Sequence, residues 1–248
     1  MGKLRYRNRD PRTVARDIPG IFDIIFPQLA PGIVTYLNRR ARSMAASEKL
    51  SEDLIQDSSL KHAMLFEIAV AVAEQLLAEL EFDIKSALAI AIQRQRRHFD
   101  AVLPDKITDI DVLIIRQVAE NLVLMLNQID NALGERLEIA PDIPGYEWIS
   151  SGQGDFALGS RLIEVKCTGK LFSSSDFRQV MMYWLLSYAH SVDGRGKEWT
   201  DAVLINPRLN RCLEIPFNEL LYLIGGGRSK VEILQLFAFM VADHMSEP

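Results

Sequence analysis

The chain has 248 residues, 48% of them hydrophobic and 25% charged, which is typical of a globular protein with one large domain or two small ones. The formal net charge of −5 argues against binding to nucleic acid through overall charge, although a local basic surface is compatible with it. No run of about 20 apolar residues occurs and no apolar segment follows the basic start, so we expect neither a membrane span nor a signal peptide.

The cysteines and histidines argue against a disulfide-stapled protein and against a histidine-bound metal site. Cys167 and Cys212 provide no disulfide framework and fit the reducing environment of the cytoplasm. Because Cys167 follows a charged strand face, we expect it to pack in the core rather than act as a nucleophile. The four histidines are scattered without metal-ligand spacing, which argues against a histidine-bound metal.

The first 17 residues are strongly basic, with arginine at the alternate positions 5, 7 and 9 and two further arginines, Arg12 and Arg16. Such a segment can lie along a phosphate backbone, or it can be an edge strand or a solvated terminus. Residues 18–37 are apolar but broken by proline and glycine, which predicts short helices that end in a second basic cluster, Arg39, Arg40 and Arg42.

Two helices are predicted next, over residues 60–80 and about 82–99. Glu67, Glu74 and Glu81 recur every seven residues in the first of them, which is typical of a solvated stripe. The second ends in a third basic cluster that includes Arg94, Arg96 and Arg97. Cations at a helix C-terminus are favoured by the helix dipole, and contact with phosphate is the alternative explanation.

A long amphipathic helix is predicted over residues 107–131, followed by an irregular linker over residues 137–144 that contains two prolines. Residues 146–149 are expected to be the first core strand, in a hairpin with residues 155–158 that turns through residues 150–154. That turn is rich in glycine but lacks the lysine and the spacing of a nucleotide-binding P-loop.

The next two strands, residues 155–158 and 161–167, are expected to form a hairpin through Gly159-Ser160. A helix over residues 175–191 should follow, with Ser174 or Ser175 as N-cap and Asp176 in its first turn. Residues 202–205 and 211–215 are expected to form a buried hairpin. A glycine joint at residues 225–227 then precedes a last helix over residues 230–244, which docks on the core or on another subunit.

The charges on the 155–167 hairpin are the most informative feature of the sequence. Glu164 and Lys166 should share one face of their strand, with Ile163 and Val165 on the opposite, apolar face. A two-residue turn brings Asp155 alongside Glu164. Carboxylates that lie so close repel each other unless a cation lies between them, and oxygen ligands suit magnesium. Alternatively, Asp155 caps a turn and the other charges form a solvated strand face.

This pattern resembles the PD-(D/E)XK nuclease superfamily, which has a restriction-endonuclease-like fold. Asp155 is followed after eight residues by Glu164-Val165-Lys166, and Gln179 and Tyr183 match the glutamine-x-x-x-tyrosine motif of the RecB-type exonuclease branch. The proline that often precedes the aspartate is replaced by Gly154. The resemblance covers roughly residues 110–215.

The resemblance implies specific roles for these residues. Asp155, Glu164 and the carbonyl of Val165 would bind Mg²⁺ or Mn²⁺, Lys166 would orient the attacking water, Gln179 would place that water or a phosphate, and Tyr183 would support Gln179. A preceding helix often carries one more glutamate, for which Glu120 is the candidate and Glu67 the reserve. An ion pair between Glu120 and Arg116 is the ordinary alternative.

We therefore expect an α/β protein: a nuclease-like domain with a mixed sheet over residues 105–248 and a helical region over residues 1–104. The expected activity is metal-dependent hydrolysis of phosphodiesters, with DNA as the preferred partner and restriction or phage defence as the setting. An RNA nuclease and a catalytically inactive binding or assembly module are the alternatives. A homodimer or partner subunits remain open. Candidate phosphate-binding residues are Arg5, Arg7, Arg9, Arg94, Arg96, Arg97 and Arg178.

Overall fold

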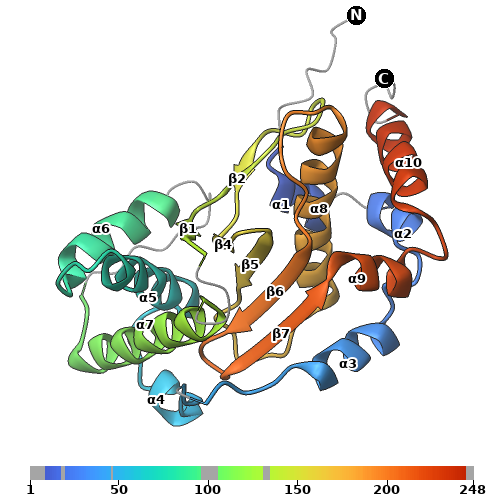
Figure 1. Ribbon diagram of the computed structural model, residues 1–248. Helices are drawn as coiled ribbons and strands as arrows, with labels where there is room; N and C mark the ends of the chain where they lie inside the picture. The colour runs from blue at the N-terminus through green and yellow to red at the C-terminus, as the bar shows by residue number, and fades with distance from the viewer. Residues whose placement is uncertain (1–8, 18–19, 46, 96–105, 131–134, 244–248) are drawn as a thin grey trace, which may run out of the picture.

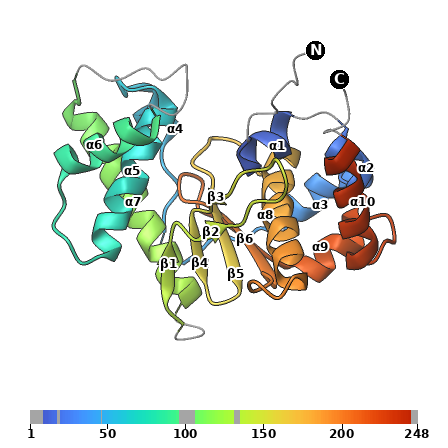
Figure 2. The ribbon, with the colours of Figure 1, turned by 90° about the horizontal axis from the view of Figure 1, so that it is seen from above.

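The computed structural model describes residues 9–17, 20–45, 47–95, 106–130 and 135–243. A five-stranded mixed sheet lies between two groups of helices (Figures 1 and 2). The helices are α1 (Pro11–Asp17), α2 (Ile21–Ile25), α3 (Pro31–Arg40), α4 (Glu52–Gln56), α5 (His62–Leu77), α6 (Ile84–Gln95), α7 (Asp109–Asp130), α8 (Ser174–Val192), α9 (Phe217–Ile224) and α10 (Lys230–Asp243). The strands are β1 (Leu137–Ile139), β2 (Asp142–Ile143), β3 (Gly152–Gln153), β4 (Phe156–Leu158), β5 (Arg161–Val165), β6 (Asp201–Asn206) and β7 (Arg211–Pro216).

The sheet has the strand order β1-β4-β5-β6-β7. β4 and β5 form an antiparallel hairpin through Gly159-Ser160, where Gly159 adopts a φ of 57° that glycine tolerates better than other residues. β5 and β6 are parallel and are joined by α8, and β6 and β7 form an antiparallel hairpin. Both hairpins predicted around residues 155–167 and 202–215 are confirmed, and so is the mixed α/β class.

The predicted first core strand is wrong. Residues 146–149 form a tight turn in which the backbone N–H groups of Tyr146 and Ile149 each donate to the other's carbonyl at 2.9 Å. Glu147, within that turn, has a φ of 52°. The strand that pairs with β4 is instead β1, in the segment expected to be an irregular linker. The prolines of that segment, Pro141 and Pro144, are compatible with both strands because they lie outside them: Pro141 separates β1 from β2, and Pro144 follows β2.

Two hydrophobic cores lie on opposite faces of the sheet, each between the sheet and one of the two groups of helices seen in Figure 2. On one face, Ile163 and Val203 pack with the helices α5, α6 and α7. On the other face, Leu162 and Leu204 pack with α8, α1, α9 and α10. Each core combines residues from before and after position 104, so the expected helical region and the expected nuclease-like domain share their hydrophobic interiors.

The longer helices follow the predicted ranges closely, although their ends differ by a few residues. Two short helices, α1 and α9, are not expected from the sequence. The N-cap of α8 is Ser173, one residue before the expected pair, and it forms a capping box with Asp176. Helix α9 was not predicted. The described part of the basic N-terminal segment is neither an arm nor an edge strand, because Pro11–Asp17 forms α1. Among the described helices, none is long and apolar enough to cross a membrane.

Candidate active site

The β4–β5 hairpin places two carboxylates side by side. Phe156 pairs with Ile163, so continuing this register by one residue sets Asp155 opposite Glu164. The backbone N–H of Val165 donates to Asp155 Oδ2 at 2.7 Å, which fixes the aspartate at the end of the ladder. Glu164 is fully buried, whereas Asp155 keeps some exposure to solvent. The predicted pairing of these two residues is therefore confirmed.

Glu164 receives all of its hydrogen bonds on one oxygen. Its Oε1 accepts from Lys166 Nζ at 2.6 Å, from Gln179 Nε2 at 2.6 Å and from Arg12 Nη2 at 3.4 Å. Its Oε2 is buried and has no hydrogen-bond partner among the described residues. An unpartnered buried carboxylate oxygen costs free energy, so this atom is a candidate ligand for a group that completes the site.

Gln179 links the strand to the helix α8. Its Oε1 accepts from Lys166 Nζ and from Arg16 Nη2, both at 3.0 Å, and its Nε2 donates to the hydroxyl of Tyr183 at 3.0 Å as well as to Glu164. The four-residue spacing predicted that Gln179 and Tyr183 share a helix face, and this is confirmed. Both residues are buried, so the amide is held in a single orientation.

Arg12 and Arg16 are the residues of this cluster that the sequence reasoning did not assign to it. Both come from α1, which packs on α8 through Val14 and Ala15. A signal was present: Asp10-Pro11 is a helix start, and a four-residue spacing puts the two arginines on one face of the helix that follows.

The pKa values follow from burial and from the clustered charges. Burial, and then the charge of Glu164, raise the pKa of Asp155 to about 7, against the opposing influence of Arg12 and Lys166. Burial raises the pKa of Tyr183 well above its usual range, so its hydroxyl stays neutral and can accept the amide of Gln179. Burial also raises the pKa of Cys167, which keeps it a thiol, in line with the expected packing role.

Within the described residues, neither Glu120 nor Glu67 contacts Asp155 or Glu164, and the third acid beside the cluster is Asp176, whose Oδ1 lies 3.6 Å from Lys166 Nζ. Glu120 is exposed on α7, and the ion pair with Arg116 does not form either, since Arg116 lies over the ring of Phe82 at 4.6 Å. Glu67 is half-buried and lies 3.5 Å from Arg94. Across the described parts of the chain, no group of three or more histidine, cysteine, aspartate or glutamate side chains is arranged to hold a metal.

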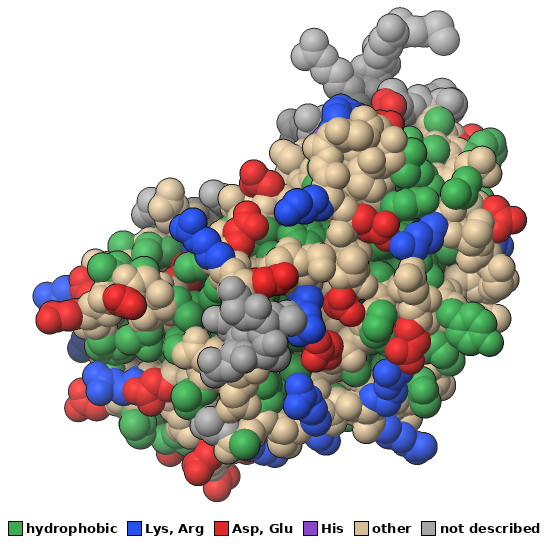
Figure 3. Space-filling view, in the orientation of Figure 1, with side chains coloured by type: hydrophobic (Ala, Val, Ile, Leu, Met, Phe, Trp, Pro, Cys, Tyr) green, Lys and Arg blue, Asp and Glu red, His purple; other side chains and the backbone are tan. Residues whose placement is uncertain are grey.

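The candidate phosphate-binding arginines have varied surroundings. Arg5, Arg7, Arg96 and Arg97 lie outside the described residues. Arg94 pairs with Glu74 at 2.7 Å and Arg178 with Asp23 at 2.5 Å, while Arg9 is exposed and forms a backbone bridge to Ile149. On the face drawn in Figure 3, basic and acidic side chains are interspersed rather than gathered by sign.

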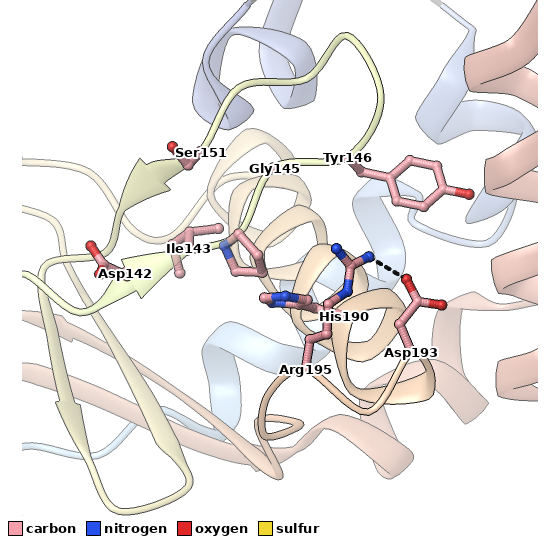
Figure 4. Close-up of a pocket in the computed structure, with 9 residues that line it drawn as sticks. Asp142, Ile143, Gly145, Tyr146, Ser151, His190, Asp193 and Arg195 are labelled. Atoms are coloured by element: carbon pink, nitrogen blue, oxygen red, sulfur yellow. Dashed lines mark hydrogen bonds and ion pairs between the residues drawn. The ribbon is translucent and has the colours of Figure 1, made fainter.

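A separate pocket of about 500 Å³ lies at the far end of α8 (Figure 4). Its walls come from β2 and the β2–β3 connection, from His190 in the last turn of α8, and from the ion pair of Arg195 with Asp193 just after that helix. Neither Asp155 nor Glu164 lines it. Because opposite charges already neutralise each other on its wall, this pocket is a weaker candidate for chemistry than the carboxylate cluster.

The cluster has the groups that metal-assisted hydrolysis requires. Asp155 and the free Oε2 of Glu164 are the oxygens that could bind a divalent cation, and the ammonium of Lys166 lies within hydrogen-bond distance of the same glutamate. Gln179 provides a neutral group whose position is set by four contacts. Comparison of the chain with protein-family models, with curated proteins and with solved structures yields no match.

Proposed function

We propose that the protein is a metal-dependent nuclease that hydrolyses phosphodiester bonds, with DNA as its substrate and a restriction-endonuclease-like core of the PD-(D/E)XK type. The observation that carries this proposal is the state of Glu164: a fully buried carboxylate with one oxygen bound by three donors and the other without a partner, beside Asp155. A second acid next to an unpartnered carboxylate oxygen is suited to binding a cation.

The donor set fits magnesium or manganese. Both prefer oxygen ligands, and magnesium usually binds through one or two carboxylates while keeping several waters. Lys166 N–H donates to Ile205 of β6, so the neighbouring residue Val165 directs its own N–H and C=O toward the opposite edge, where Asp155 lies. The Val165 carbonyl is therefore a reasonable further ligand. When bound, such an ion lowers the pKa of a coordinated water and neutralises charge on the phosphate.

The remaining residues of the cluster position the reactants. Lys166 would hold the attacking water by its ammonium and stabilise charge that develops on the phosphate oxygens. Gln179 would orient Lys166, because its Oε1 accepts from Nζ at 3.0 Å, and it would offer its amide to the water or to the phosphate. Tyr183 would fix the amide rotamer through its hydroxyl.

The topology supports the same proposal without deciding it. The elements follow one another in the order that the resemblance implies: first the hairpin that carries the acids, then the crossover helix with Gln179, then the parallel strand β6. Helices cover both faces of the sheet, so the polar cluster is confined to the end of β5 and the facing side of α8.

A catalytically inactive binding or assembly module is the competing candidate. It is favoured by the balance of charge: Lys166 and Arg12 already neutralise much of the acidic charge, and the third acid near the site, Asp176, pairs with Lys166 at 3.6 Å. An inactive module would bind no divalent cation at Asp155 and would cut neither DNA nor RNA. The two candidates therefore differ in a simple assay.

The decisive experiment compares the wild-type protein with Lys166→Ala on plasmid DNA, single-stranded DNA and RNA, with magnesium, with manganese and with EDTA. We expect cleavage that requires the metal and that falls by about 10²–10⁴-fold in the variant, as for loss of a positioned catalytic group. Lys197→Ala, which removes an exposed lysine away from the cluster, is the matched control. Unchanged cleavage by Lys166→Ala would refute the assignment, and the choice of polymer separates a DNA nuclease from an RNA nuclease.

A further inference from the structure

We propose that Arg12 is a catalytic residue that binds the scissile phosphate, an inference that rests on the nuclease function proposed above. Arg12 belongs to α1 and reaches the acidic cluster from outside the sheet, 152 positions away from Glu164 in the chain. Its guanidinium has several planar donors that match the geometry of a phosphate, which suits it to this role better than a lysine.

The backbone that carries Arg12 is well anchored. Asp10 accepts the backbone N–H of Arg12 at 2.8 Å and the hydroxyl of Thr13 at 2.7 Å, and Pro11 begins the helix with a suitable φ. Val14 and Ala15 are buried against α8, which also carries Gln179. The guanidinium is therefore presented from a fixed element, as a substrate-binding group requires.

The contact of Arg12 with Glu164 is the weakest of the three on that oxygen. It measures 3.4 Å, against 2.6 Å for both Lys166 and Gln179. Within the described residues, only Nη2 of its guanidinium has a hydrogen-bond partner. The Arg12 side chain is 39% exposed, whereas that of Glu164 is 0% and that of Lys166 is 9% exposed. Arg12 and the exposed Arg16 are thus the cations of the cluster that a polymer can reach, and of these two only Arg12 contacts a carboxylate among the described residues.

The balance of charge points the same way. Asp155, Glu164 and Asp176 face the cationic side chains of Lys166, Arg12 and Arg16, so the cluster is close to neutral without a metal. With a divalent cation on the carboxylates, the same cluster carries surplus positive charge. A phosphodiester and the additional negative charge of its transition state would restore the balance, and Arg12 is the group free to meet them.

This role differs from that of a structural support for Glu164, and the two make opposite predictions for metal binding. If Arg12 competes with the cation for Glu164, then Arg12→Ala should bind magnesium as tightly as the wild type or a few-fold more tightly. If Arg12 held Glu164 in place, the same variant should lose magnesium affinity. Isothermal titration calorimetry with magnesium alone measures this directly, with Glu164→Gln as the variant that loses binding.

Activity and substrate binding complete the test. Arg12→Ala should lower kcat/KM for plasmid cleavage by about 100-fold, and Arg12→Lys should recover only part of it because an ammonium lacks the planar fork. In calcium, used to support binding without cutting, Arg12→Ala should weaken binding of a fluorescent DNA oligonucleotide. Arg195→Ala, an exposed arginine paired with its neighbour Asp193, should match the wild type in both assays.

The outcomes separate the two proposals. If the wild type cuts and Arg12→Ala cuts and binds equally well, or binds magnesium less tightly, the role of Arg12 is overturned and the nuclease function stands. If the wild type does not cut but binds the oligonucleotide in a way that depends on Arg12, the nuclease function fails and Arg12 remains a phosphate ligand. If the wild type neither cuts nor binds the oligonucleotide, both proposals fall.

Discussion

Replacing Asp155 with asparagine should stabilise the metal-free protein at high pH and leave its stability almost unchanged at low pH. Burial and the neighbouring charge of Glu164 raise the pKa of Asp155 from 3.8 to about 7. The unfolded chain therefore loses this proton near pH 3.8, while the folded chain keeps it until about pH 7. Between these values the folded state binds more protons, so its stability falls as the pH rises.

The size of the effect follows from the same shift. One pKa unit corresponds to about 1.4 kcal/mol, so a rise of roughly three units sets an upper limit of about 4 kcal/mol. Asp155 is partly exposed, and screening by solvent reduces the expected gain to about 1–2 kcal/mol. Asparagine keeps the shape of the side chain and can still accept the N–H of Val165, so little else should change.

The prediction is tested by measuring the free energy of unfolding in urea and EDTA at about pH 4 and about pH 8, below and above the pKa of Asp155 in the folded protein. Asp142→Asn is the matched control, because Asp142 is exposed on β2 in the same ribbon. We expect the Asp155 variant to exceed the wild type only at the higher pH. Equal stability of the two proteins at both pH values would mean that Asp155 is ionised at no cost, and the crowded pair of acids would not exist.

Magnesium should reverse the order of stability at the higher pH. A ligand present at 100 times its dissociation constant stabilises the folded state by about 2.7 kcal/mol. The wild type should gain this increment because both carboxylates are available, and Asp155→Asn should gain little because one ligand is neutral. The same unfolding experiment with magnesium therefore tests the metal site without relying on catalysis.

Two further substitutions test the supports of the cluster. Tyr183→Phe removes the hydroxyl that accepts a hydrogen bond from Gln179 Nε2 at 3.0 Å. The rate of cleavage should fall by about 10-fold, and the free energy of unfolding in urea should fall by about 1 kcal/mol. An unaltered rate would show that the amide does not depend on this hydroxyl. Asp176→Ala removes the capping box with Ser173 and the ion pair with Lys166, so thermal unfolding should show a loss of about 1–2 kcal/mol, and an unchanged Tm would contradict the importance of this cap.

The central hairpin could be predicted because its information is local. Alternation along residues 161–167 assigns each side chain to a face, and the two-residue turn at Gly159-Ser160 fixes the register. From that register alone, Asp155 must lie opposite Glu164. The helix that follows is equally local, since a spacing of four residues places Gln179 and Tyr183 together on any α-helix.

The edge of the sheet could not be predicted in the same way. Residues 146–149 have aromatic and β-branched side chains that favour a strand, yet Trp148 is buried in a turn and donates its indole N–H to the carbonyl of Val241. Val241 belongs to the last helix, 93 positions later. No local feature of the segment indicates this partner. The strand β1 was not predicted because the prolines that follow it favour an irregular linker.

The positions of the α1 arginines and of Glu120 in α7 could not be predicted from the sequence, for a related reason. Composition identified the N-terminal segment as basic, but the partners of Arg12 and Arg16 lie more than 150 positions away. Helical periodicity placed Glu120 on a polar face of its helix, and only the packing of α7 against α5 determines that this face points to solvent. Long-range packing, not local preference, decides both cases.

The fold itself does not require a charged cluster at the end of β5. Leu162 lies on the same face of that strand, two residues before Glu164, and packs against α8 as an ordinary core residue. Apolar side chains at positions 164, 166 and 179 would extend that core, and replacing a buried ion pair by packed apolar groups is often neutral or stabilising. Instead, the chain buries a glutamate with an unpartnered oxygen, a lysine and a glutamine. A requirement for stability does not explain that choice, whereas the chemistry proposed for this position does.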